Sequence, residues 1–497
     1  MPTPRRRLRA DGALRDVFAA IRAEHEVPEE FGAPALAEAE NAARRPHADG
    51  HADLTDLPFV TIDPPGSMDL DQAMHLARTP RGYRVRYAIA DVAAFVVPGG
   101  ALDAAVHERV LTVYCPDTRV PLHPPVLSEG ATSLLPDQVR PAVVWDLDLD
   151  RDGQVRATAV VRALVRSRSR LAYPQVQQAL DAGPGPDELP RLLAEIGTAR
   201  AGLERARGGV SLARPEQEVV EEPGAGWRLE FRGPLPVEDH NAQISLMTGM
   251  AAARLMIEAG VGVLRTLPAA SGDDVMRLRR RALALGLAWP RRRSYAEVLA
   301  GVDASRPADA AFLTAATSLF RGAAWVPFQG APPPEPDHGA IGAPYAHVTA
   351  PLRRLVDRYG LEIALAVSAD REPPAWVLER LASLGDVMAA GSRRANAVDR
   401  ACTDAVEAAV LASRVGEVFS GVALDERTVQ LAEPAVVART VEADLPAGRR
   451  VRVRLEAADP ATRSVTLRRV RRGPDQDGPR PHGALGSRAD DGPGGRQ

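Results

Sequence analysis

The chain has 497 residues, of which 45% are hydrophobic and 26% are charged. This length exceeds that of one small domain and predicts two or three domains with full hydrophobic cores. The net charge of -3 argues against a broad basic surface, so any binding of nucleic acid would have to use a local groove. All 62 basic residues are arginine, so phosphate contacts would come from guanidinium groups or backbone amides.

Residues 1–54 are rich in arginine, alanine and glutamate, which predicts an N-terminal extension of one or two helices. Strand patterns dominate from about residue 57 to 150, and Arg84–Val97 becomes continuously apolar, as in a central strand. Helical periodicity is expected from about 190 to 300, from 310 to 325 and from 352 to about 414. Together these segments predict an α+β domain over residues 55–410.

The last part of the chain has a different character. Five short, alternating, valine-rich segments between 415 and 472 fit a small β-barrel of the OB type, placed at 411–472. Residues 473–497 are rich in proline and glycine and are expected to form a disordered tail.

The chain has only two cysteines, Cys115 and Cys402, which lie far apart and have no metal-ligand spacing. This usage is typical of a reducing compartment and excludes a disulfide framework. The sequence shows no apolar run of about 18 residues and no signal peptide. We therefore expect a cytoplasmic protein without membrane contact, and no obligate protein partner is evident.

An acidic loop, TIDPPGSMDLDQ at 61–72, is the most informative stretch. Asp63 is expected at the end of a buried strand, and the Pro-Pro-Gly-Ser that follows forces a turn. Asp69 and Asp71 are two residues apart, so in extended chain they point to the same side. Clustered carboxylates raise one another's pKa unless cations neutralise them, and hard oxygen ligands suit Mg²⁺ or Mn²⁺. The alternative is a solvated acidic turn.

A second segment, YAHVTAPLRRLVDR at 345–358, predicts a helix that begins near Pro351, a favoured first position. Thr349 lies near that start, and Arg353 and Arg354 fall in the first turn. Cations are disfavoured there by the helix dipole unless an anion compensates, which suggests a phosphate site. The alternative is an ordinary helix with surface arginines.

Three further features have two interpretations each. Tyr114 and Tyr173 are isolated aromatic residues that belong either to the core or to a stacking platform for nucleobases. The stretch WDLDLDRDG at 145–153 resembles the opening of a calcium loop, but Ala159 stands where that loop needs a glutamate. We therefore expect a β-hairpin with one solvated face there.

Taken in order, these segments resemble the ribonuclease II (RNB) family of exoribonucleases from about residue 55 to 405. The matching blocks are TIDPPGSMDLDQ at 61–72, AIADV at 88–92, YCPDTRVPL at 114–122, LSEGATSLLP at 127–136, LAYPQV at 171–176, VED at 237–239, YAHVTAPLRRLVDR at 345–358 and RRANAVDR at 393–400. Gln72 departs from the family's fourth acidic position, and Val348, Ala350 and Leu355 depart from its later motif.

The resemblance implies an RNB catalytic domain, with a mixed sheet and surrounding helices, followed by the OB-like barrel. The family's usual N-terminal cold-shock modules do not fit into residues 1–54. The implied activity is that of a hydrolase of the exoribonuclease II type. It would remove nucleoside 5′-monophosphates from single-stranded RNA with a free 3′ end.

The resemblance also implies roles for individual residues. Asp71, Arg353 and Asp69 would be catalytic. Asp63, Asp69 and Asp71 would hold Mg²⁺, with Mn²⁺ as a possible substitute, and Gln72 would be an uncharged fourth ligand. The residues implied to contact RNA are Tyr114, Tyr173, Glu238, His347, Thr349, Arg354 and Asp399.

Two other functions fit parts of this pattern. Gln72 would lower metal affinity, so the alternative is a non-catalytic RNA-binding protein with a degenerate RNB site. A metal-dependent phosphatase acting on small esters would leave the two tyrosines and the β-barrel unexplained.

Overall fold

The structure is a computed structural model that describes residues 11–45, 47, 50–183, 185–210, 216–222 and 226–471. The tail predicted at 473–497 lies outside the described residues. Within the described part, no helix has both the length and the apolar character that a membrane span requires.

A mixed six-stranded sheet with the order β1-β8-β2-β3-β4-β7 forms the centre of the larger domain. Its strands are β1 (Ala52–Asp53), β2 (Phe59–Asp63), β3 (Gln72–Thr79), β4 (Gly82–Ala90), β7 (Val139–Asp150) and β8 (Val155–Ala172). The long β8 pairs with β7 up to Arg166 and then, in parallel, with β2 from Ser167 onward. The sheet therefore curls onto itself, and the predicted α+β class is confirmed.

Two local predictions about this sheet have different outcomes. The stretch at 145–153 forms the hairpin between β7 and β8, as predicted, and Asp150 accepts hydrogen bonds from the amides of Asp152 and Gln154 at its turn. The central strand predicted over Arg84–Val97 is too long, because β4 ends at Ala90 and Val92–Ala94 forms a short 3₁₀ turn.

Helices cover the sheet and enclose the largest hydrophobic cluster, which includes Tyr87, Trp145 and Met247. They are α3 (Ala101–Arg109), α4 (Tyr173–Asp181), α5 (Leu189–Ala206), α6 (Pro236–Ala259), α10 (Leu355–Ser368) and α11 (Ala375–Ala412). At Gly249 of α6, an added Cβ would lie 2.1 Å from the Tyr345 ring, so the glycine allows the 345–349 segment to lie against this helix.

Helices occupy most of 190–300 and of 310–325, as the periodicity predicts, but strands that were not predicted also lie in these ranges. A hairpin of β9 (Glu216–Glu222) and β10 (Gly226–Arg232) interrupts the first range, and β11 (Val261–Thr266) pairs with β12 (Ala324–Gln329). Trp227, Leu229 and Phe231 alternate along β10 and pack into one cluster, so strand periodicity prevails there. Further helices and strands are β5 (Val113–Tyr114), β6 (Arg119–Val120), α7 (Gly272–Ala284), α8 (Tyr295–Leu299), α9 (Pro307–Ala316), β13 (Asp337–His338) and β14 (Ala343–Pro344).

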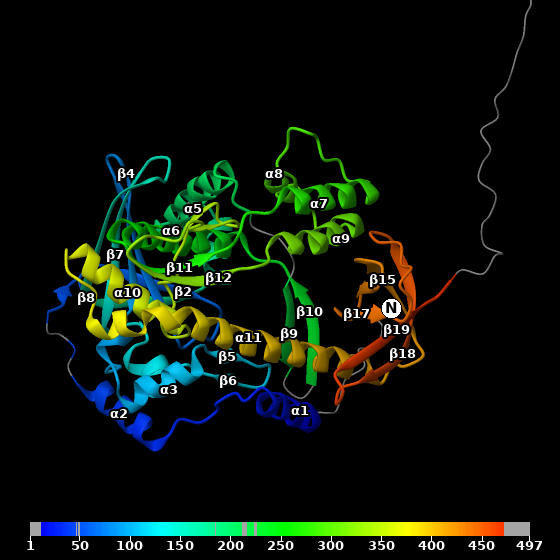
Figure 1. The fold of residues 1–497 in the computed structure, drawn as a ribbon, viewed down its shortest axis with the longest axis horizontal. Coiled ribbons are helices and arrows are strands. Elements are labelled where there is room, and N and C mark those ends of the chain that lie inside the picture. Colours follow the sequence, from blue (N-terminus) through cyan, green and yellow to red (C-terminus); the bar gives the residue numbers. More distant parts are fainter. Residues whose placement is uncertain are drawn as a thin grey trace, which may run out of the picture.

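The long helix α11 connects the sheet domain to a closed C-terminal barrel (Figure 1). The barrel strands are β15 (Val418–Ala423), β16 (Thr428–Leu431), β17 (Val437–Thr440), β18 (Arg450–Asp459) and β19 (Ser464–Arg469). They coincide with the five predicted segments, which confirms the OB-like barrel.

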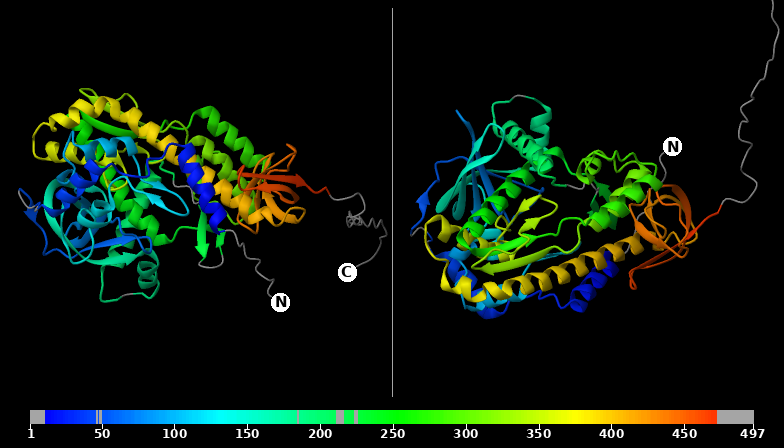
Figure 2. Two further views of the ribbon diagram at one scale, coloured as in Figure 1. Left: turned by 90° about the horizontal axis from the view of Figure 1, so that it is seen from below. Right: turned by 45° about the horizontal axis from the view of Figure 1, so that its top comes forward.

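The N-terminal extension contains two helices, α1 (Asp11–Glu24) and α2 (Ala33–Arg44). Helix α1 lies alongside α11 (Figure 2). Phe18 of α1 makes an edge-to-face contact with Trp227 of β10, with ring centroids 5.6 Å apart. The extension is therefore packed against the rest of the protein.

Candidate active site

Asp63 is the last residue of β2, as predicted from the sequence. The chain then turns back through Pro64–Ser67, where the Ser67 amide donates to the Pro64 carbonyl at 3.2 Å and Gly66 has a φ of +85°. Burial raises the pKa of Asp63 to about 7, and the nearby negative charge of Asp69 acts in the same direction. Its Oδ2 atom is buried without a hydrogen-bond partner among the described residues.

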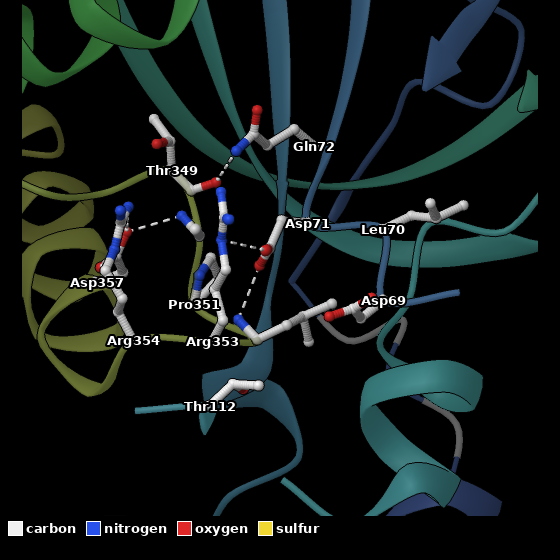
Figure 3. A network of polar contacts seen from close by, with 12 residues as sticks. Asp69, Leu70, Asp71, Gln72, Thr112, Thr349, Pro351, Arg353, Arg354 and Asp357 are labelled. Carbon is white, nitrogen blue, oxygen red and sulfur yellow. Dashed lines mark hydrogen bonds and ion pairs between the residues drawn. The ribbon is translucent and has the colours of Figure 1, made fainter. Parts of the chain in front are cut away.

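Asp71 is buried at the centre of the site (Figure 3). Its Oδ1 accepts a hydrogen bond of 2.8 Å from the Leu352 amide, and its Oδ2 lies 3.4 Å from Nε of Arg353. Burial raises the pKa of Asp71 to about 7, although the Arg353 charge acts in the opposite direction. Leu70, which lies between Asp69 and Asp71 in the chain, is fully buried, and its amide donates a hydrogen bond of 3.0 Å to Ser133 Oγ.

The turn before α10 presents Arg353 to this carboxylate. The prediction that the helix begins near Pro351 is wrong, because α10 begins at Leu355. Asp357 holds the preceding chain in a turn: its Oδ1 accepts the Ala350 amide at 2.7 Å, and both its oxygens accept from Arg354. Arg353 thus precedes the helix, and 46% of its side chain is exposed.

Three other residues predicted to contact RNA lie within or next to this turn. Arg354 is half-buried in its ion pair with Asp357 (Figure 3). Thr349 is buried, and its hydroxyl is 2.9 Å from the Ser245 hydroxyl on α6. Burial lowers the pKa of His347 well below its usual value, which favours a neutral ring beside Trp325. In this structure the three side chains support the turn that carries Arg353.

Gln72 is the first residue of β3 and directly follows Asp71 in the chain. Its Nε2 donates to the Thr349 carbonyl at 2.7 Å, and its Oε1 accepts from the Tyr87 hydroxyl of β4. The nitrogen therefore connects the sheet to the turn, as Figure 3 shows, and the oxygen connects β3 to β4.

Asp69 faces a different element. Its Oδ1 lies 2.5 Å from Nη1 of Arg119 on β6, and Arg119 also pairs with Glu129. Arg119 stands opposite Tyr114 in the β5–β6 hairpin. The half-exposed Tyr114 side chain lies close enough to Arg353, Asp69 and Asp71 for their charges to act on it. The hairpin therefore forms one wall of the site.

Tyr173 lies near Asp63, because the preceding residue, Ala172, pairs with Asp63 in the sheet. It is the first residue of α4, and its hydroxyl accepts a 3.1 Å hydrogen bond from Asn241 on α6. Burial, followed by the charge of Asp63, raises the pKa of Tyr173 to about 12. Glu238 in the first turn of α6 pairs with Arg232 at 2.7 Å, whereas Asp399 is exposed on α11 outside these contacts.

The carboxylates meet some of the requirements of a site for a divalent cation. Asp63 and Asp71 offer hard oxygen ligands whose charge is disfavoured by burial, and the unpartnered Oδ2 of Asp63 could be satisfied by a metal ion. Asp69 already has a cation in Arg119, and the Gln72 carboxamide is bonded at both ends. As the described side chains stand, no three His, Cys, Asp or Glu residues converge on one metal position.

Two protein-family models match the chain. The model of the RNB domain matches residues 51–363, which is more than half of the chain. The chain belongs to the RNB family. The model of the RNase II-type exonuclease C-terminal S1 domain matches residues 417–470, which contain the barrel strands β15–β19.

Two of the curated relatives that match the chain are ribonuclease R and exoribonuclease 2. The chain is 29% identical to ribonuclease R of Escherichia coli over 400 residues, which are 75% of this chain and 48% of that protein. It is 38% identical over 131 residues to exoribonuclease 2 of Photorhabdus laumondii, covering 26% of this chain and 20% of the relative. The chain therefore spans about half the length of ribonuclease R, and its match to exoribonuclease 2 covers a smaller share of that relative.

Solved RNB structures share the fold. Apo RNase R of Mycoplasma genitalium matches with a TM-score of 0.82 at 20% identity, covering 92% of this chain and 78% of that one. The same enzyme in complex with ribose-methylated single-stranded RNA gives the same values. Yeast Ssd1, described as a pseudonuclease, matches with a TM-score of 0.67 at 15% identity, covering 91% and 58%. The fold is thus common to nucleases and to a pseudonuclease.

Arg119, Tyr87 and Asn241 also contact site residues in this RNB domain, although no role was predicted for them from the sequence. Arg119 stands within the matched block at 114–122, and Asn241 is one helical turn after Glu238. A signal was therefore present for these two residues. For Tyr87, a buried tyrosine on a strand, no local pattern distinguishes a site residue from a core residue.

Proposed function

We propose that this RNB-family protein hydrolyses single-stranded RNA from its 3′ end and releases nucleoside 5′-monophosphates. The observation that carries the proposal is the pairing of buried Asp71 with the half-exposed Arg353 guanidinium, 3.4 Å apart, beside Asp63. An anion held in a desolvated position next to an accessible cation suits a site where phosphate charge is bound and redistributed.

Each of the chain's own residues has a definite task in this proposal. Arg353 contacts the non-bridging oxygens of the reacting phosphate, since its guanidinium is accessible and its backbone is fixed by the turn. A donor of this kind stabilises the transition state by about 3 kcal/mol. Tyr114 and Tyr173 stack against the terminal bases.

Asp63, Asp69 and Asp71 would hold Mg²⁺ or Mn²⁺. The bound metal would supply positive charge that lowers the pKa of an attacking water and neutralises charge on the phosphate. Asp69 would share its charge between the metal and Arg119, whose pairing with Glu129 gives it a second anionic partner.

We also propose that the protein works in the cytoplasm with RNA as its partner. The absence of a cysteine framework in the sequence supports this, because only two cysteines occur and both are free thiols in the structure. Fractionation of the cells that make the protein tests the location: recovery with secreted or membrane material would contradict it.

The reaction is tested by identifying its products. Purified protein is incubated with uniformly labelled linear RNA and with the same sequence as a circle, and the products are separated by chromatography. We expect nucleoside 5′-monophosphates from the linear RNA and no product from the circle, which has no 3′ end. Cleavage of the circle, or release of oligonucleotides from within the linear strand, would overturn the proposal.

A second candidate function is RNA binding without cleavage. The observation that favours it is Gln72, an uncharged residue at the fourth acidic position of the motif, whose amide is bonded to Thr349 and Tyr87. Retention of linear RNA in a filter-binding assay, with no product in the presence of Mg²⁺ or Mn²⁺, would favour this candidate.

A further inference from the structure

Gln72 stands beside Asp71, in a motif where the resemblance places a fourth acidic residue. We propose that in this protein Gln72 is a positioning residue, which fixes the turn carrying Arg353 against Asp71, and that it does not ligate the metal. The effect of Gln72 on catalysis rests on the proposed function, whereas its role in holding the turn does not.

The direction of the carboxamide follows from its two partners. The Thr349 carbonyl can only accept a hydrogen bond, so the Gln72 nitrogen must face it, at 2.7 Å. The oxygen then faces the hydroxyl of Tyr87, which is fully buried on the neighbouring strand β4 and donates to it. A carboxylate at this position would place an acceptor against the Thr349 carbonyl. An amide satisfies both partners and a carboxylate does not.

These contacts close a ring around Asp71. From Thr349 the backbone runs three residues to Leu352, whose amide donates to Asp71 Oδ1 at 2.8 Å. Asp71 is followed directly by Gln72, which returns to the Thr349 carbonyl. Both hydrogen bonds of the ring are drawn in Figure 3. Each of the two bonds links the turn to the segment that carries the carboxylate.

Hydrogen bonds next to this ring hold the backbone of Arg353. The Ala350 carbonyl, next to Thr349, accepts hydrogen bonds from the amides of Arg353 at 3.2 Å and Arg354 at 3.0 Å. On the other side, the Arg353 carbonyl accepts from the Thr112 amide at 3.1 Å. A shift at Thr349 therefore passes through a single residue to the backbone of Arg353. Displacement of a reacting group by about 1 Å can lower a rate by ~100-fold.

The test compares four variants with the wild type in two assays. Gln72→Met removes both hydrogen bonds at similar size, and Gln72→Asp restores the acid but is one methylene shorter. Tyr87→Phe removes only the hydroxyl, and Gln329→Met makes the same change at an exposed site on β12. Steady-state RNA degradation gives kcat and KM, and the paramagnetic resonance of free Mn²⁺ gives metal affinity without turnover.

A positioning role predicts a fall in kcat of ~10- to 100-fold for Gln72→Met and for Gln72→Asp. KM and Mn²⁺ affinity are expected to stay within about twofold of the wild type, because Tyr114, Tyr173 and the three aspartates are untouched. Gln329→Met is expected to behave as the wild type. Tighter Mn²⁺ binding with higher kcat in Gln72→Asp, or Mn²⁺ binding weakened about tenfold in Gln72→Met, would overturn the proposal.

A second measurement separates this inference from the proposed function. Thermal unfolding is compared for Gln72→Met, Tyr87→Phe and the double variant. If Gln72 holds the turn through a bond that Tyr87 orients, the two shifts in melting temperature are not additive. Additive shifts would overturn the positioning role even in a protein that degrades no RNA. A non-additive result in an inactive protein would overturn the proposed function alone.

Discussion

Replacing Asp117 by asparagine tests how the N-terminal helix supports the site. Nη1 of Arg22, on α1, donates to Oδ1 of Asp117 at 2.9 Å and to Oδ2 at 3.1 Å, and its Nε donates to Glu29 at 2.9 Å. Asp117 lies in the turn between β5 and β6, so the pair joins α1 to the hairpin that carries Tyr114. We therefore expect the substitution to destabilise the fold and to loosen one wall of the site.

The burial of the pair sets the magnitude. Only 7% of the Arg22 side chain and 8% of the Asp117 side chain are exposed. Removing one partner of a buried ion pair costs about 3–5 kcal/mol, because the other charge stays buried without compensation. Glu29 still pairs with Arg22, but it is 45% exposed, so we expect the lower end of this range, about 3 kcal/mol. We also expect RNA affinity to fall by up to about tenfold, which corresponds to about 1.4 kcal/mol of binding free energy.

Thermal unfolding followed by circular dichroism, and fluorescence anisotropy with single-stranded RNA, measure the two effects of Asp117→Asn. Asp148→Asn removes the same charge at an exposed site on β7 and serves as the matched control. Combining Asp117→Asn with Arg22→Met removes the uncompensated charge and is expected to recover much of the stability. If Asp117→Asn and Asp148→Asn unfold and bind RNA alike, α1 does not brace the hairpin.

Three other substitutions have expected outcomes. Arg353→Lys keeps the charge but loses the planar pair of donors, so kcat for RNA degradation is expected to fall by about 100-fold with KM little changed; an unchanged kcat would remove Arg353 from the mechanism. Tyr114→Ala is expected to weaken RNA binding by about 1–3 kcal/mol in fluorescence anisotropy, and an unaltered Kd would exclude stacking on this ring. Burial raises the pKa of Glu407 from 4.5 to about 7. Between these two pH values the folded protein keeps a proton that the unfolded chain releases. The free energy of unfolding therefore falls as the pH rises from about 4.5 to 7. Glu407→Gln is therefore expected to raise the free energy of unfolding at pH 8 by at most about 3 kcal/mol and to make it less dependent on pH in chemical unfolding. Glu456→Gln, at an exposed position, is the control. A pH dependence as steep as that of the wild type would contradict the burial argument.

Much of the fold follows from local signals in the sequence. The buried strand before Asp63, the turn at Pro64–Ser67 and the five barrel strands are each specified by neighbouring residues, and all are present in the structure. The hairpin of β9 and β10 was not predicted, because its alternating residues lie between long helical segments. The start of α10 was misplaced since Asp357, rather than Pro351, fixes the chain there.

The contacts within the site are harder to obtain from the sequence. Gln72 bonds to Thr349, 277 positions away, and Asp71 bonds to Leu352, 281 positions away. The pairing of Asp69 with Arg119 likewise depends on how the β5–β6 hairpin docks against the acidic loop. Local patterns identify which residue types meet in the site, but only the packed fold decides which atoms of those residues are bonded to one another.

The central claim is that Asp71 and its neighbours cut RNA from the 3′ end. The most direct measurement is a time course on 5′-labelled single-stranded RNA with Mg²⁺ and with EDTA, for the wild type and Asp71→Asn. We predict a ladder of products shortened from the 3′ end that is lost both in EDTA and in the variant. Intact RNA that the wild type still retards on a native gel would contradict the claim and identify an RNA-binding protein.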